Sequence, residues 1–141
     1  LYAAGQAAER FAVRNSGAHA VIEGCGANGC EYMTGGKVAI LGSVGDNFGA
    51  GMTGGMAFLY DPANRFADVV NADTVTWARL GSPYWEAILK DMIERHVGHT
   101  RSKLGRTILD QWETERGRFW QVVPKEVLDR LEAPLIAEAA E

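Results

Sequence analysis

Several features are scarce in this sequence, and each scarcity excludes a class of protein. Its 141 residues include only two cysteines, Cys25 and Cys30, too few for a disulfide framework, so we expect a reduced pair. No apolar run approaches the roughly 20 residues that a membrane-spanning helix needs. The formal net charge of −4 offers no basic footprint for nucleic acid. Because the start, LYAAGQAAER, also has no basic leader, we expect a cytoplasmic protein without a membrane or nucleic-acid partner.

Glycine, in contrast, is abundant and unevenly placed: all but 4 of the 17 glycines precede residue 62. The tetrapeptide MTGG at residues 33–36 returns 19 residues later at 52–55. The glycine column Gly17, Gly36, Gly55 is followed each time by an apolar run, AHAVIE, KVAILG or MAFLYD. Helical repeats are longer than about 30 residues and glycine weakens helices, so the repeat predicts short strands joined by turns.

Strands repeated at this interval predict a mainly β fold, a single-stranded parallel β-helix with about 19 residues per coil. In such a solenoid the glycine pair marks a recurring corner, and Gly36 is expected to have a positive φ. Equivalent strand positions then stack into two apolar columns, Val21, Ile40, Leu59 and Ile22, Leu41, Tyr60. Because both faces are apolar, we expect the outer face to be covered by the tail or by a neighbouring domain.

The chain changes character after residue 62, which predicts two parts: the last coils at 1–62 and an α-helical C-terminal tail at 63–141. The pattern of the tail predicts a connector, a helix from Ser82-Pro83 to Gly98, and a second helix over 102–115 that completes a helical hairpin. An extended FWQVVP and a last helix from Pro124 through Leu131 follow. The tryptophans Trp85, Trp112 and Trp120 are expected to be packing anchors. Residues 1–4 align with 20–23, so the chain begins inside a strand; together with a first residue other than Met, this predicts a β-helix truncated at its N-terminus.

One motif favours a different function. GCGANG at residues 24–29 fits G-x-G-x-x-G, and Asp46 stands where a ribose-binding acid is found. A dinucleotide site also needs a helix at its last glycine, whereas CEYMTGG reaches another glycine pair first. A nucleotide-binding oxidoreductase domain therefore stays as the alternative. A phosphate loop at Gly36-Lys37 is excluded, because Val38 replaces the required Ser or Thr.

The histidines and nucleophiles give no site. His96 and His99 form H-x-x-H, but no third ligand can be nominated, so both are expected at the surface or at a helix C-terminus. His19 is expected to be an outward polar residue of a strand. No serine or cysteine has an activating base in view. We therefore predict no catalytic, cofactor-binding or metal-binding residue.

The segments ERFAVRNSGAHAVIEGCGANGCEYMTGG and GDNFGAGMTGGMAFLYD, with the tail ending in FWQVVP, resemble the glycine-repeat domain at the C-terminus of the glutamate synthase large subunit. The resemblance implies a right-handed parallel β-helix with more coils than are seen here. It also implies a parent oxidoreductase that moves the amide nitrogen of glutamine onto 2-oxoglutarate, in glutamate biosynthesis and nitrogen assimilation. Its cofactors would be FMN and an iron–sulfur cluster, with FAD and NAD(P)H or ferredoxin acting through the electron donor.

In that family the glutaminase nucleophile is an N-terminal cysteine, and FMN and the cluster belong to a central barrel. Neither Cys25 nor Cys30 matches those motifs, so no catalytic residue is carried over. The resemblance implies a scaffold that positions the amidotransferase and FMN-binding domains of the same chain, with the small electron-donating subunit as a further partner. A stand-alone glycine-repeat subunit of another oxidoreductase is the second alternative.

Overall fold

The computed structural model of the chain describes residues 16–23, 33–42, 48–49, 52, 54–61, 65–68, 70, 75–79 and 83–125. Its elements are, in order, β1 (Ser16–Ile22), β2 (Thr34–Ile40), β3 (Gly54–Tyr60), η1 (Phe66–Asp68), β4 (Val75–Arg79), α1 (Pro83–Thr100), α2 (Lys103–Asp110), α3 (Trp112–Glu115), η2 (Arg116–Arg118) and β5 (Phe119–Pro124). Within this part of the chain, no helix has the length and apolar character needed to cross a bilayer.

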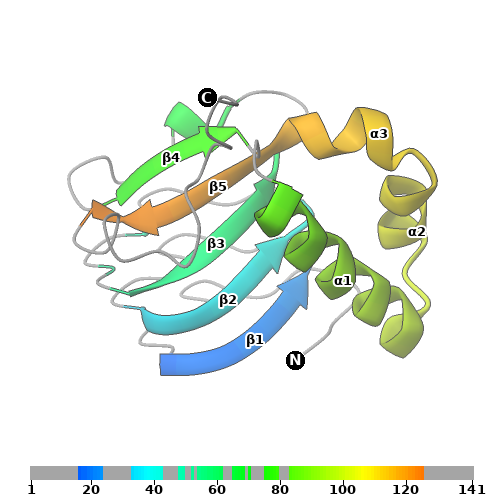
Figure 1. Cartoon of the computed structure of the whole chain (residues 1–141), viewed down its shortest axis with the longest axis horizontal. Coiled ribbons are helices and arrows are strands. Elements are labelled where there is room, and N and C mark those ends of the chain that lie inside the picture. The colour runs from blue at the N-terminus through cyan, green and yellow to red at the C-terminus, as the bar shows by residue number, and fades with distance from the viewer. Residues whose placement is uncertain are drawn as a thin grey trace.

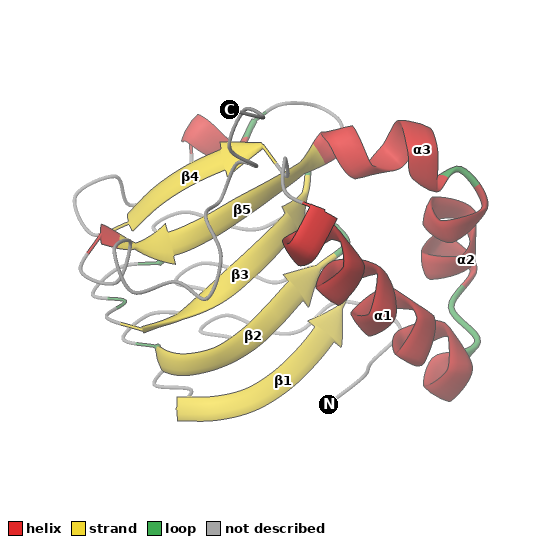
Figure 2. Cartoon of the chain, in the orientation of Figure 1, coloured by secondary structure: helices red, strands yellow, loops and turns green. Residues whose placement is uncertain are grey.

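All five strands belong to one sheet, in the order β1-β2-β3-β5-β4. β1, β2 and β3 pair in parallel, whereas β5 pairs antiparallel with both β3 and β4. Figure 1 shows α1 lying across one face of this sheet near the ends of β1–β3, with α2 and α3 leading back to β5. Figure 2 shows α1, α2 and α3, in red, grouped beside one end of the strands, in yellow. The architecture is therefore an α/β arrangement around a mixed open sheet.

The predicted right-handed parallel β-helix with a helical tail is wrong. The described strands form one open sheet that does not curl into a solenoid, and β5 pairs antiparallel with β3 on the side where a further coil would stack in parallel. The 19-residue period did predict parallel neighbours, and β1, β2 and β3 are such neighbours. A period alone does not distinguish stacked coils from adjacent strands of an open sheet, because both give the same ladder spacing. Strands from both predicted parts, 1–62 and 63–141, enter this sheet.

The predicted register is correct between β2 and β3 but wrong by one residue between β1 and β2. Ile40 pairs with Leu59 as predicted, but its partner in β1 is Ile22 instead of Val21. The register shifts between Ser16 and His19. One extra residue in a strand transfers every later side chain to the opposite face, so Val21 and Ile22 exchange the faces predicted for them. His19 consequently pairs with Lys37 and not with Val38.

The glycine pairs lie inside strands. Gly36 has φ 86°, which confirms the predicted positive φ, and Gly55 in the next copy has φ 82°. The predicted corner is wrong, because Gly36 belongs to β2 and Gly55 to β3. The register shifts between Thr34 and Lys37, where β2 contains one residue more than β3. The glycine of β2 therefore builds a β-bulge, which needs a left-handed backbone conformation that glycine adopts cheaply.

The tail contains the predicted helical hairpin with different boundaries. α1 starts at Pro83 as expected but continues through Gly98 to Thr100, where Arg101, with φ 57°, ends it. The predicted helix over 102–115 is two helices, α2 and α3, separated at Gln111. FWQVVP forms β5, which confirms the expected extended segment. The predicted last helix through Leu131 lies outside the described residues.

Both sheet faces are covered, as predicted. Residues of α1, α2 and α3 pack on one face with Val21, Ala39 and Phe58, and this cluster contains the buried Trp85 and Trp112. On the other face Phe48, Met52 and Phe66 pack with Ile22, Ile40 and Leu59, and Trp120 is partly buried against them. The three tryptophans are thus packing residues, as expected. Burial on both faces explains why the strands are apolar runs without a polar alternation.

Candidate functional site

Part of the sequence predictions lies beyond what the structure describes. The motif GCGANG at residues 24–29, Asp46, Cys25 and Cys30 all fall outside the described residues, so the dinucleotide alternative stays untested. Gly36 and Lys37, considered for a phosphate loop, lie in β2 within the sheet. His19 lies in β1, the strand at one edge of the sheet.

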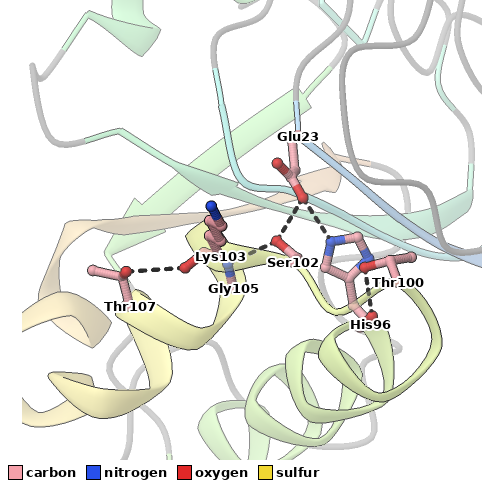
Figure 3. A network of polar contacts seen from close by, with 7 residues as sticks. All are labelled: Glu23, His96, Thr100, Ser102, Lys103, Gly105 and Thr107. Atoms are coloured by element: carbon pink, nitrogen blue, oxygen red, sulfur yellow. Dashed lines mark hydrogen bonds and ion pairs between the residues drawn. The ribbon is translucent and has the colours of Figure 1, made fainter.

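A polar cluster joins three elements at the turn between α1 and α2, as Figure 3 shows. Glu23 directly follows β1, His96 lies in α1, and Ser102 is the N-cap of α2. Glu23 Oε2 accepts a hydrogen bond from Ser102 Oγ at 2.6 Å and contacts His96 Nε2 at 3.0 Å. Ser102 Oγ in turn accepts the backbone N–H of Gly105 at 3.0 Å. One carboxylate therefore ties the end of β1 to the last part of α1 and the first turn of α2.

His96 is buried, so its predicted place at the surface is wrong. Its exposed fraction is 0 %, and it belongs to the core-facing side of α1 with Trp85, Leu89 and Met92. The spacing of these positions at 85, 89, 92 and 96 is that of a buried helix stripe, so the sequence contained a signal for burial. His99 is exposed, in agreement with the prediction for that residue. The partner of its Nε2, Glu23, is 73 residues away along the chain and had no signal in the sequence.

The cluster contains the residue types of a hydrolase triad, but its hydrogen bonds do not activate the serine as a nucleophile. A catalytic serine gives its proton to a histidine that a carboxylate orients. Here Ser102 donates to the carboxylate itself, and His96 contacts the same oxygen. The arrangement therefore supports a structural role. Within the described residues, no group of three or more His, Cys, Asp or Glu side chains could hold a metal ion.

A second acid, Asp61, fixes the segments that meet at the end of β3. Asp61, directly after β3, accepts the backbone N–H groups of Arg65 and Phe66 at 3.0 and 2.9 Å and Trp120 Nε1–H at 2.8 Å. Burial alone would raise the pKa of Asp61, but these hydrogen bonds and the positive charge of Arg79 lower it below its usual value. The Arg79 guanidinium stacks on the ring of Trp120, 3.8 Å from its centroid. Asp61 thus joins β3, η1 and β5.

Neither acid was predicted from the sequence, although the sequence contains a signal for both. Glu23 ends the repeat copy AHAVIE and Asp61 ends MAFLYD, so each acid stands at the last position of its copy. A polar residue that recurs directly after a buried strand is a candidate for fixing the following loop.

An open groove lies between α1 and β2. It has a volume of about 430 Å³ and is lined by Lys37 of β2 and by Ala87, Ile88, Asp91, Met92 and Arg95 of α1. Arg95 Nε is 2.9 Å from Asp91 Oδ2, one turn earlier on the same helix. The lining therefore combines two cations and one anion with the apolar side chains of Ala87, Ile88 and Met92.

An iron–sulfur cluster, which the family resemblance implies for the parent protein, does not fit this chain. Such clusters are held by about four cysteine thiolates. The chain has two cysteines in all, so its residues cannot supply that ligand set.

Comparison with known proteins places the chain in a family. The GXGXG motif family matches residues 1–125. The large chain of the NADPH glutamate synthase of Azospirillum brasilense is 57% identical over 135 residues, which cover 96% of this chain and 9% of that protein. The ferredoxin-dependent glutamate synthase 1 (chloroplastic/mitochondrial) of Arabidopsis thaliana is 50% identical over 133 residues, 94% of this chain and 8% of that protein.

The NADH glutamate synthase of Schizosaccharomyces pombe is 47% identical over 132 residues, 92% of this chain and 6% of that protein. The chain thus spans less than a tenth of the length of these relatives. The resemblance seen in the sequence is confirmed: nearly the whole chain aligns with glutamate synthases, and it belongs to the GXGXG motif family.

Proposed function

We propose that this chain is a non-catalytic assembly domain of a glutamate synthase large subunit. The parent enzyme would carry out the glutamine-dependent reductive amination of 2-oxoglutarate to glutamate. The domain would position the amidotransferase and FMN-binding domains of the same chain. One observation carries the proposal: the similarity covers 92 to 96% of the chain in relatives named for NADPH, ferredoxin or NADH, at 57, 50 and 47% identity.

Similarity across these three donor types supports a role that the enzymes share and not one specific to a donor. The described polar side chains support an architectural role as well. Glu23, Ser102 and Asp61 bind backbone N–H groups and neighbouring side chains that fix loops and helix ends. The positive-φ glycines Gly36 and Gly55 lie in strands that pair with each other, whereas a phosphate cradle needs its glycines in a loop before a helix.

The cofactors of the parent would belong to its other domains. FMN and the iron–sulfur cluster would lie in the synthase part, and FAD with NAD(P)H, or ferredoxin, would act through the electron donor. A small electron-donating subunit is a further partner in the proposal. We propose a cytoplasmic location for the parent protein.

The test compares the purified chain with the full-length protein that contains it. We expect the full-length protein to form glutamate from glutamine and 2-oxoglutarate. The chain alone should show no glutaminase activity and no saturable binding of NADPH or FMN at micromolar concentration in calorimetric titration. Failure of the full-length protein to form glutamate would refute the proposed parent. Saturable NADPH binding that Gly26→Val abolishes would instead establish the nucleotide-binding alternative.

A further inference from the structure

Lys37 occupies an unusual place on the sheet. It lies on the face that α1 covers, where its neighbours Ala39 and Leu41 in β2 and its β3 partner Met56 are all buried in the apolar cluster. A lysine on such a face is usually paired with an anion. Lys37 is partly exposed, and no residue that the structure describes forms an ion pair with it. Among the described residues, the ammonium group of Lys37 therefore lines the groove beside α1 without a carboxylate that pairs with it.

The helix side of the groove adds a second cation and an apolar surface. Ile88, Asp91 and Arg95 are spaced along one side of α1, at intervals of three and four residues. Arg95 uses its Nε to bind Asp91, and a guanidinium carries further N–H donors that can bind a second carboxylate. The single negative charge of Asp91 neutralises only one of the two positive charges, those of Lys37 and Arg95. An incoming group that carries one negative charge and apolar neighbours would complement the groove.

We propose that this groove docks an extended segment from another domain of the parent protein, whose Asp or Glu carboxylate pairs with Lys37 and Arg95. The apolar neighbours of that carboxylate would contact Ile88 and Met92. The inference rests on the proposed function, because it takes the chain to be part of a larger assembly. The relatives supply that context, since the chain accounts for only 6 to 9% of their length. The groove is open to solvent, which fits a polypeptide segment better than an enclosed small molecule.

The experiment is zero-length cross-linking of the native full-length protein with a carbodiimide, followed by peptide mass spectrometry. We expect an amide between the amine of Lys37 and an Asp or Glu outside residues 1–141. Lys103, exposed on α2 and away from the groove, is the matched control and should form no such link reproducibly. Lys37→Gln should abolish the link and lower the melting temperature of the full-length protein. Lys37→Arg, which keeps the charge but has no primary amine, should also abolish the link while restoring the melting temperature.

Several outcomes would overturn the proposal. One is a Lys37 cross-link only to acids within residues 1–141, since the chain would then fill its own groove. A second is an absence of any Lys37 link together with equal melting temperatures of the Gln and Arg variants. A third is loss of the Lys37 link when 2-oxoglutarate or glutamate is added alone, with no glutamine present to allow the reaction. This result would indicate that the groove binds a small carboxylate ligand. Glutamate formation is measured on the same preparations. Loss of glutamate formation would count against the proposed parent enzyme, whereas the cross-linking result tests the docking site independently.

Discussion

Replacement of Gly55 by alanine tests the role of the positive-φ glycine in β3, beside the bulge of β2. At φ 82° a Cβ on residue 55 would lie 2.9 Å from both the carbonyl carbon and the oxygen of Gly35, and 2.7 Å from Met33 Cε. Met33 can move its terminal methyl group, but the backbone of Gly35 is held in the sheet. A left-handed backbone costs a non-glycine residue about 1–2 kcal/mol. Overpacking against the neighbouring strand costs about 1–3 kcal/mol, and reduced unfolded-state entropy returns about 0.4–1 kcal/mol.

These terms predict that Gly55→Ala destabilises the chain by about 3 kcal/mol, which corresponds to a loss of about 10 °C in melting temperature. The assay is thermal and urea unfolding followed by far-ultraviolet circular dichroism. Gly98→Ala is the control, because a Cβ at this exposed position of α1 meets nothing within 4 Å. It should leave stability equal or raise it by up to about 1 kcal/mol.

A second variant separates the two causes of the loss. Asparagine tolerates the left-handed conformation better than alanine, yet its Cβ meets the same backbone atoms of Gly35. If the close approach dominates, Gly55→Asn will be as unstable as Gly55→Ala. If only φ matters, Asn will recover part of the stability. Unchanged stability of Gly55→Ala would refute the role assigned to Gly55 altogether.

Three further predictions concern the polar contacts and the helix end. Glu23→Ala should lower the free energy of unfolding in urea by about 1–3 kcal/mol, because Nε2 of the buried His96 loses its carboxylate partner. The control is Glu113→Ala, whose side chain is 84% exposed. A loss for Glu23→Ala no larger than that of the control would contradict the prediction. Arg101→Gly should stabilise the chain by about 0.5–1 kcal/mol, since φ 57° favours glycine; a lower melting temperature would argue against strain there. Because the pKa of Asp61 is lowered in the folded state, its stabilising effect is present above the unfolded-state value of about 4 and is lost as the pH falls through the folded-state pKa. The stability difference between the chain and Asp61→Asn should therefore shrink in acid, and a difference that is constant from pH 7 to pH 2 would count against the assignment.

The glycine repeat was the most informative feature of the sequence. What it did not predict about the sheet has a physical reason. The 19-residue interval predicted parallel strands, and the register of Ile40 with Leu59 follows it. The interval could not reveal the additional residue between Ser16 and His19, because a bulge changes the register without changing the spacing of the glycines. It also could not foresee that β5 would pair antiparallel beside β3, because that contact joins segments about 60 residues apart.

The sequence by itself determined the local features: the strands and their apolar character, the positive φ at Gly36, the start of α1 at Pro83, the strand FWQVVP, and the family. Each depends on the conformational preference of one residue or on a period within a short window. Only the tertiary structure decided that the sheet is open and that Glu23 binds Ser102, 79 residues away. It alone also placed Lys37 beside Arg95 in one groove. These arrangements depend on how α1 and β5 pack against distant strands, and a pattern read along the chain contains no information about which distant surfaces meet.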